Sequence, residues 1–203
     1  MPQTPKPDRE SPKANRGPSA GPANRQALID AAGEVFAELG YNAPLREIAR
    51  RAGVGQGSMY RHFSDRIALG LAVFESSIEE LESLVTQENY TLNDLFDRIA
   101  EQAQTSAALT ELLTSNGSDP RVSRLGERTR DSAARVLERE QAAGRLGTDL
   151  TADHAMLAIA MLATMLAKSD PEERPAVARR AREILDAAFA CTSATTTGRP
   201  VAR

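Results

Sequence analysis

Between Arg46 and Phe63 the chain reads REIARRAGVGQGSMYRHF, and this stretch constrains the local fold more than any other. Apolar and small residues recur at the spacing of one helical face. Gly53 follows them, where a helix end often needs a left-handed backbone. A left-handed backbone conformation costs a residue with a side chain about 1–2 kcal/mol. Val54 then fills the turn, and Met59 is the inward residue of a second segment. The stretch therefore predicts two short helices joined by a tight turn.

The second of these helices has the composition of a helix that enters a DNA major groove. Gly55 and Gly57 keep its start thin, so that the backbone can approach DNA closely. We expect Gln56, Ser58 and Tyr60 to read bases, because polar groups on the exposed face of such a helix reach base edges. The other polar groups near the two ends are expected mainly on phosphates: Arg46, Arg61, His62 and Arg66.

The flanking residues extend the helical pattern on both sides. The entering segment NRQALIDAAGEVFAELG places its apolar residues on one face, and a long helix begins near Asp65 with DRIALGLAVFE. From about Asn24 to Glu75 this order of features resembles the DNA-binding headpiece of the TetR family of repressors. The run Tyr60-Arg61-His62-Phe63 carries the resemblance most strongly. It implies a ligand-responsive regulator, a repressor, that binds a palindromic double-stranded DNA operator as a homodimer and is released by a small-molecule effector.

The connection before the helix-turn-helix differs from that of many family members, which carry a threonine-rich segment there. Here the residues are Asn42, Ala43 and Pro44. We expect Pro44 in the first turn of the helix, where its fixed φ and missing N–H cost nothing. Asn42 or the backbone of Ala43 would then cap that helix.

Composition favours helix along the whole chain. It has 203 residues, of which 41% are hydrophobic and 26% charged, alanine is abundant, and no window alternates apolar and polar residues for long. With the resemblance, this predicts an all-α fold: a three-helix headpiece joined by a long helix to a helical ligand-binding and dimerisation domain. The predicted divisions are a disordered tail (1–23), the headpiece (24–66), the larger domain (67–191) and a second disordered tail (192–203).

Charge is unevenly placed although the net charge is only −3. Residues 1–66 hold ten Lys or Arg against seven Asp or Glu, and the remainder holds fifteen against twenty-one. A mildly basic start on an acidic body suits a protein that holds DNA at one end. The N-terminal tail either touches the DNA backbone or is plainly solvated, and the sequence leaves both open.

A cytoplasmic location with no membrane contact is expected. The first residues lack the apolar segment of a signal peptide, and the longest apolar run, 155–167, is too short to cross a bilayer. The single cysteine, Cys191, excludes an internal disulfide framework and fits a reducing compartment. Cys191 itself reads as a small structural residue or as a redox sensor.

The last two predicted helices, 153–167 and 171–190, differ from the others in their apolar surface. The first is apolar almost all round, and a helix of that kind in a small chain must be covered by something. The resemblance implies that the two helices form half of a four-helix dimer interface. We expect it to contain Leu157, Met161, Val177, Ala181, Ile184, Leu185 and Ala188.

The resemblance also implies an effector cavity among the helices of residues 66–190. Its predicted lining residues, each of which also fits a plain core position, are Phe74, Ile78, Phe96, Ile99, Gln102 and Met156. Gly70 lies inside the long helix that follows the headpiece. It is read either as a site of close packing against the first helix or as a pivot for the headpiece.

The sequence gives little support to two other classes of function. An enzyme has little support, because His62 and His154 each stand alone and no nucleotide-binding or nucleophile motif occurs. We therefore predict no catalytic residue, no metal and no cofactor. A helical interaction module without DNA binding is the third reading, and the intact GVGQGSMYRHF argues against it.

Overall fold

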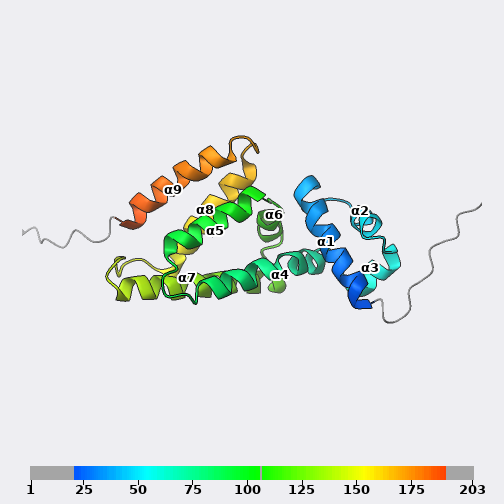
Figure 1. Ribbon diagram of the computed structural model, residues 1–203, viewed down its shortest axis with the longest axis horizontal. Helices are drawn as coiled ribbons and strands as arrows, with labels where there is room; N and C mark the ends of the chain where they lie inside the picture. Colours follow the sequence, from blue (N-terminus) through cyan, green and yellow to red (C-terminus); the bar gives the residue numbers. More distant parts are fainter. Residues whose placement is uncertain (1–20, 106, 191–203) are drawn as a thin grey trace, which may run out of the picture.

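The computed structural model describes residues 21–105 and 107–190, and within these ranges it contains helices and no strand. Helices α1–α3 are grouped at one end of the molecule, and α4 leads from them into a body built by the rest (Figure 1). The helices are α1 (Gly21–Leu39), α2 (Leu45–Arg51), α3 (Gln56–His62), α4 (Arg66–Leu84), α5 (Leu92–Thr105), α6 (Ala108–Ser115), α7 (Pro120–Ala142), α8 (Ala152–Lys168) and α9 (Arg174–Ala190). The all-α prediction is confirmed.

Two details at the start of the chain differ from expectation. α1 begins at Gly21, so residues 21–23 are helical and not part of a tail. α2 begins at Leu45 with Pro44 as its cap residue, outside the first turn, and no side chain caps it. The backbone of Pro44 is extended, with a ψ of 126°, so Pro44 lies just before the first helical residue. The remaining predicted tails, residues 1–20 and 192–203, and Cys191 lie outside the described residues.

The turn between α2 and α3 has the predicted geometry. Gly53 has a φ of +65°, and a side chain there would meet no atom within 4 Å. Backbone conformation alone therefore explains this glycine. Val54 and Met59 are buried at 9% and 1% exposure, beside Ile48 of α2 and Phe36 of α1.

The core of the headpiece continues beyond α3 into the body. Leu69 and Phe74 of α4, Leu112 of α6 and Val122 of α7 belong to the same buried cluster as the residues of α1–α3. A second cluster joins α5, α7, α8 and α9 around Phe96. The starts of α6 and α7 are thus packed with the headpiece, although the sequence suggested a division near residue 66. The predicted domain boundaries themselves stay a prediction.

Gly70 is a site of close packing. A Cβ on this residue would lie 2.9 Å from Cε2 of Tyr41 and 3.4 Å from Cδ2 of Leu112. Its neighbours are therefore the loop after α1 and the helix α6, whereas the sequence pointed to the first helix. A side chain at this position would push apart the contact between α4 and both of these elements.

Several ionic contacts hold the body together, and two of them involve α7. Arg128 of α7 pairs with Glu75 and Glu82 of α4 at 2.6 and 2.7 Å, which ties the two long helices side by side. Glu140 is only 5% exposed, and its carboxylate accepts the Leu92 N–H at 2.8 Å where α5 begins. Its other oxygen lies 3.0 Å from Arg145 Nε. Both oxygens are satisfied, so this buried charge is compatible with folding.

α8 is apolar on two opposite sides, as its sequence predicts. Ala155, Leu162 and Leu166 point into the core, whereas Leu157 and Met161 are each 61% exposed. His154 is used at the helix start, where Nδ1 lies 3.1 Å from the Thr151 backbone nitrogen. None of the described helices is long and apolar enough to cross a membrane.

Candidate nucleic-acid interface

The recognition candidate α3 is held by its buried side and exposes the other. Met59 and Phe63 fix it to the headpiece core at 1% and 4% exposure. On the opposite side Gln56, Tyr60 and Arg61 are exposed, with 53% of Tyr60 open to solvent. Ser58 and His62 are half-buried at the edges of this face. A rigid helix with a polar outer face is what major-groove readout requires.

The two glycines at the start of α3 have no role in the packing of the chain itself. Neither Gly55 nor Gly57 has a positive φ, and a Cβ on either would meet no atom within 4 Å. The fold would accept alanine at both positions. A requirement for glycine would have to come from something that approaches from outside.

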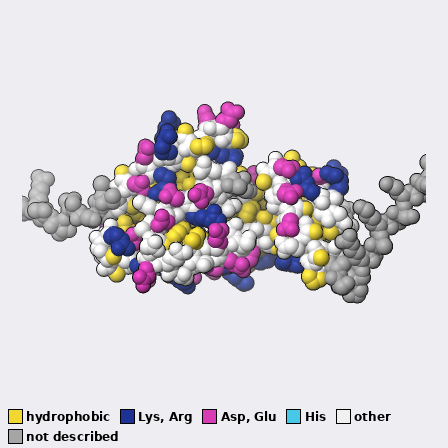
Figure 2. Space-filling model, in the orientation of Figure 1, with side chains coloured by type: hydrophobic (Ala, Val, Ile, Leu, Met, Phe, Trp, Pro, Cys, Tyr) yellow, Lys and Arg dark blue, Asp and Glu magenta, His cyan; other side chains and the backbone are white. Residues whose placement is uncertain are grey.

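The positive charge available to DNA is smaller than the arginine count of the headpiece suggests. Residues 21–66 hold six arginines and five acidic residues. Arg50 pairs with Glu47, and Arg51 pairs with Glu38 at 2.7 Å. Acidic and basic side chains are accordingly mixed at both ends of the face in Figure 2.

Four arginines of the headpiece make no ion pair with any described residue: Arg25, Arg46, Arg61 and Arg66. Arg46 and Arg61 are exposed near the two ends of the helix-turn-helix, which agrees with their predicted use on phosphates. Arg25 was missed by the sequence argument. Its guanidinium lies over the ring of Phe63 at 5.2 Å, beside the end of α3. Only this cation–π contact, formed across 38 positions of sequence, marks it as part of the same surface.

Arg66 is the exception among the predicted phosphate contacts. Its Nη1 donates to the carbonyl oxygens of Tyr41 and Ala43, both at 2.6 Å, and its guanidinium lies 5.7 Å from the centre of the Tyr41 ring. Nη1 of this half-buried arginine is committed to two backbone carbonyls. Arg66 thus fixes the loop after α1 to the start of α4, and its predicted phosphate contact stays a prediction.

Comparison with known proteins shows which family has a headpiece of this kind. Residues 28–73 match the model of the family described as bacterial regulatory proteins, tetR family. Residues 28–73 thus form a DNA-binding headpiece of the tetR-family type. It is 42% identical over 76 residues to the HTH-type transcriptional activator FasR of Mycolicibacterium smegmatis, a match that covers 37% of this chain and 35% of FasR.

Two further comparisons extend across most of the chain. The HTH-type transcriptional repressor Rv1474c of Mycobacterium tuberculosis is 28% identical over 167 residues, which cover 76% of this chain and 89% of that protein. The crystal structure of the TetR transcriptional regulator SCO0520 from Streptomyces coelicolor is similar in fold, with a TM-score of 0.58 at 24% identity. It covers 82% of this chain and 99% of the other. These similarities indicate a DNA-binding transcriptional regulator of the tetR-family type and not an enzyme.

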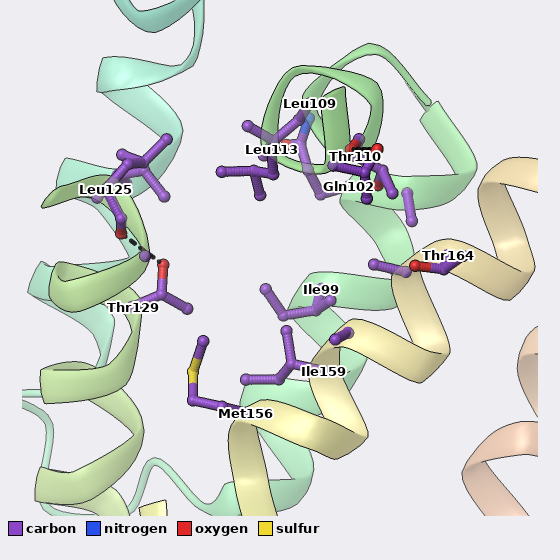
Figure 3. Close-up of a pocket in the computed structure, with 16 residues that line it drawn as sticks. Ile99, Gln102, Leu109, Thr110, Leu113, Leu125, Thr129, Met156, Ile159 and Thr164 are labelled. Carbon is purple, nitrogen blue, oxygen red and sulfur yellow. Dashed lines mark hydrogen bonds between the residues drawn. The ribbon is translucent and has the colours of Figure 1, made fainter. Parts of the chain in front are cut away.

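A second site of this regulator lies in the body, away from α3. It is a cavity of about 160 Å³ bordered by α4–α8. Four of the six predicted lining residues border it: Ile78, Ile99, Gln102 and Met156. The prediction was wrong for Phe74 and Phe96, which pack inside the two core clusters and do not border the cavity. Residues of α6 and α7 also border the cavity and were not predicted from the sequence (Figure 3). They include Leu109, Thr110, Leu113, Leu125 and Thr129.

Helix α6 contacts this cavity on one side and the headpiece on the other. Leu109, Thr110 and Leu113 border the cavity. One position along, the Glu111 carboxylate accepts the backbone N–H of Tyr41 at 2.9 Å. Leu112 is fully buried in the headpiece cluster. A displacement of α6 by a bound molecule would therefore change contacts of the loop that joins α1 to α2.

A second link joins the start of α7 to the start of α4. Arg121 Nη1 lies 3.1 Å from the carboxylate of Asp65, which also caps α4 by accepting the Ala68 N–H at 2.7 Å. Arg121 donates to Asp119 as well, and these hydrogen bonds lower the pKa of Asp119 to about 2. No local pattern in the sequence indicates this contact, because Arg121 and Asp65 are 56 positions apart.

The outer surface of α8 and α9 carries an apolar groove. Met161, Met165 and Ile184 are 61%, 41% and 68% exposed, and all three border it. The predicted interface residues differ in how far they are available. Leu157 and Ala188 are exposed, Val177 and Leu185 are half-buried against the chain's own core, and Ala181 is 8% exposed. Ala181 belongs to that core, so a substitution there would test folding more than association.

Proposed function

We propose that this protein is a ligand-released repressor of the tetR-family type that binds a palindromic operator as a homodimer. The observation that carries the proposal is the position of α6, which borders the cavity and also contacts the headpiece. A ligand can weaken DNA binding only by its different affinity for the DNA-bound and released states. α6 offers the contacts through which such a difference would arise. That Rv1474c is named a repressor supports the direction of control.

Dimerisation is supported by the apolar groove on α8 and α9. Large exposed apolar patches rimmed by polar residues mark interaction surfaces. The occupant that fits best is a second copy of the same two helices, because a self-complementary surface gives a symmetric dimer. A symmetric pair of headpieces also suits a palindromic operator, whose half-sites lie about 34–36 Å apart.

The proposal is tested by selecting operator DNA from a random library with the purified protein. The selected operator is then titrated with and without compounds that raise the protein's melting temperature. A palindromic selected sequence, bound by two chains and released by one of those compounds, would support the operator symmetry, the dimer and the ligand release. Selection of no sequence, or of a sequence without symmetry, would contradict the operator model.

Replacing Gln56 with alanine is expected to change which operator variants are preferred. Gln56 is exposed at the first position of α3, and a good bidentate base contact is worth about 1–3 kcal/mol of discrimination. The matched variant Arg61→Ala should weaken all sequences similarly and flatten the salt dependence of binding, as loss of a phosphate contact does. Binding of single-base operator variants at several salt concentrations separates the two. If Gln56→Ala weakened specific and random DNA equally, Gln56 would not read a base.

Gly57→Ala is expected to stabilise the protein and weaken its operator binding. A helical glycine costs about 0.5–1 kcal/mol relative to alanine, and no atom of the chain crowds this position. A methyl group between α3 and a closely approaching DNA backbone should lower affinity by about tenfold, or ~1.4 kcal/mol. Thermal unfolding and operator titration of the same variant provide both readings. Unchanged operator affinity would mean that DNA does not approach α3 closely at this point.

A further inference from the structure

The polar groups of the cavity fall into two classes, those already bonded within the chain and those left open. The hydroxyl of Thr114 donates to the Thr110 carbonyl at 2.8 Å, and that of Thr129 donates to the Leu125 carbonyl at 3.2 Å. By contrast, the amide of Gln102 and the hydroxyls of Thr110 and Thr164 make no hydrogen bond with any described residue. All three residues are half-buried, so their open polar groups can pair with a ligand that enters the cavity.

These open groups share one side of the cavity. Figure 3 shows Gln102, Thr110 and Thr164 toward one side, with Leu125, Thr129 and Met156 toward the other. The far side is apolar apart from the committed hydroxyl of Thr129. The cavity thus has one hydrogen-bonding end and one hydrocarbon end. Such an arrangement fits a molecule with a single polar head and an apolar body.

Charge and volume limit the ligand further. Within the described part of the chain, no Asp, Glu, Lys, Arg or His borders the cavity. A charged ligand would lose its hydration without gaining a counter-charge. The volume of about 160 Å³ is close to that of an apolar cavity of ~150 Å³ that binds benzene. A ring with a short substituent is therefore the size that fits.

We infer that this cavity binds an uncharged molecule of about the size of one substituted ring, with its hydrogen-bonding head on Gln102. The inference rests on the proposed ligand control and names the chemical class of the effector. Gln102 is assigned the head because its amide both donates and accepts, so that it can pair with a hydroxyl, a carbonyl or an ether oxygen. Thr110 and Thr164 complete the polar end.

Four compounds with the same ring test the class: toluene, benzyl alcohol, benzoate and benzylammonium. Their affinities are measured at pH 7 by NMR titration of the full chain without DNA. The two neutral compounds are expected to bind. The two ions should bind at least about a hundredfold more weakly, because an unpaired ion would be desolvated. Ions that bind within tenfold of the neutral pair, or a series in which no compound binds, would overturn the inference.

The variant Gln102→Leu tests the position of the head. It should weaken benzyl alcohol by about 2–10-fold, the worth of one neutral hydrogen bond, and leave toluene unchanged or tighter. The matched control is Gln104→Leu on the same helix, since that side chain does not border the cavity and bonds to the Ala100 carbonyl. Equal weakening of both compounds by Gln102→Leu would contradict the assignment.

Operator titration with saturating benzyl alcohol separates this inference from the proposed function. Binding of the neutral compounds with a fall in operator affinity supports both. Binding of the neutral compounds with unchanged operator affinity would support the ligand class and overturn ligand release. Binding of the ions in preference would overturn the ligand class whatever happened to the operator.

Discussion

Replacing Met161 and Ile184 together with glutamate is expected to convert the protein into monomers that bind operator about 100–10,000-fold more weakly. The two side chains are 61% and 68% exposed and border one apolar groove on α8 and α9. Two glutamates from each chain would bring four like charges into a desolvated contact. A monomer contacts only one half-site of the operator. It therefore loses the gain in affinity that comes from two linked headpieces binding the same DNA. Sedimentation velocity and operator titration measure the two effects.

A control variant separates association from general effects of a surface charge. Leu39 is 57% exposed at the end of α1, far in sequence from the groove, so Leu39→Glu should leave the dimer intact. Thermal unfolding of each variant reports on folding, because none of the three side chains belongs to the buried core. A folded double variant that still sediments as a dimer would move the interface to another surface.

The recognition helix could be predicted because its determinants are local. Gly53, Val54 and Met59 lie within seven positions of one another, and each acts through backbone conformation or helical spacing. The structure gives Gly53 its positive φ and buries the other two. Nothing distant in the chain has to be known for this part of the fold.

The use of Arg66 could not be predicted in the same way. Its partners are the carbonyls of Tyr41 and Ala43, which depend on how the loop after α1 folds back onto α4. The sequence shows only a cation next to a recognition segment, and that pattern is equally typical of a phosphate contact. The bonds to backbone carbonyls 25 and 23 positions away become visible only in the folded chain.

The cavity was predicted in part for a related reason. Ile78 and Ile99 line it while Phe74 and Phe96 do not, although all four are apolar residues at helical spacing. Which apolar face meets a void and which meets another helix depends on how α4 to α8 are packed together. The place of α6 between the cavity and the headpiece cannot be read from its eight residues alone.

Replacing Glu111 with alanine is expected to uncouple ligand binding from DNA release. The Glu111 carboxylate accepts the Tyr41 N–H at 2.9 Å and lies against Gly40, whose φ of +79° shapes the end of α1. In the parent protein a coupling of about 1–3 kcal/mol would lower operator affinity 5–150-fold at saturating ligand. Without the carboxylate, a shift of α6 would no longer pull on this loop, and most of that change should disappear.

The conservative variant Glu111→Gln distinguishes a coupling role from a general structural one. Its amide oxygen can still accept the Tyr41 N–H, so it should retain most of the ligand response. Ligand affinity without DNA should be similar in all three proteins, because Glu111 does not border the cavity. Thermodynamic reciprocity adds a second reading: operator DNA should weaken ligand binding in the parent protein and in Glu111→Gln, but much less in Glu111→Ala. If the alanine variant kept the full response in both directions, α6 would act on the headpiece through its buried contacts at Leu112 and not through this carboxylate.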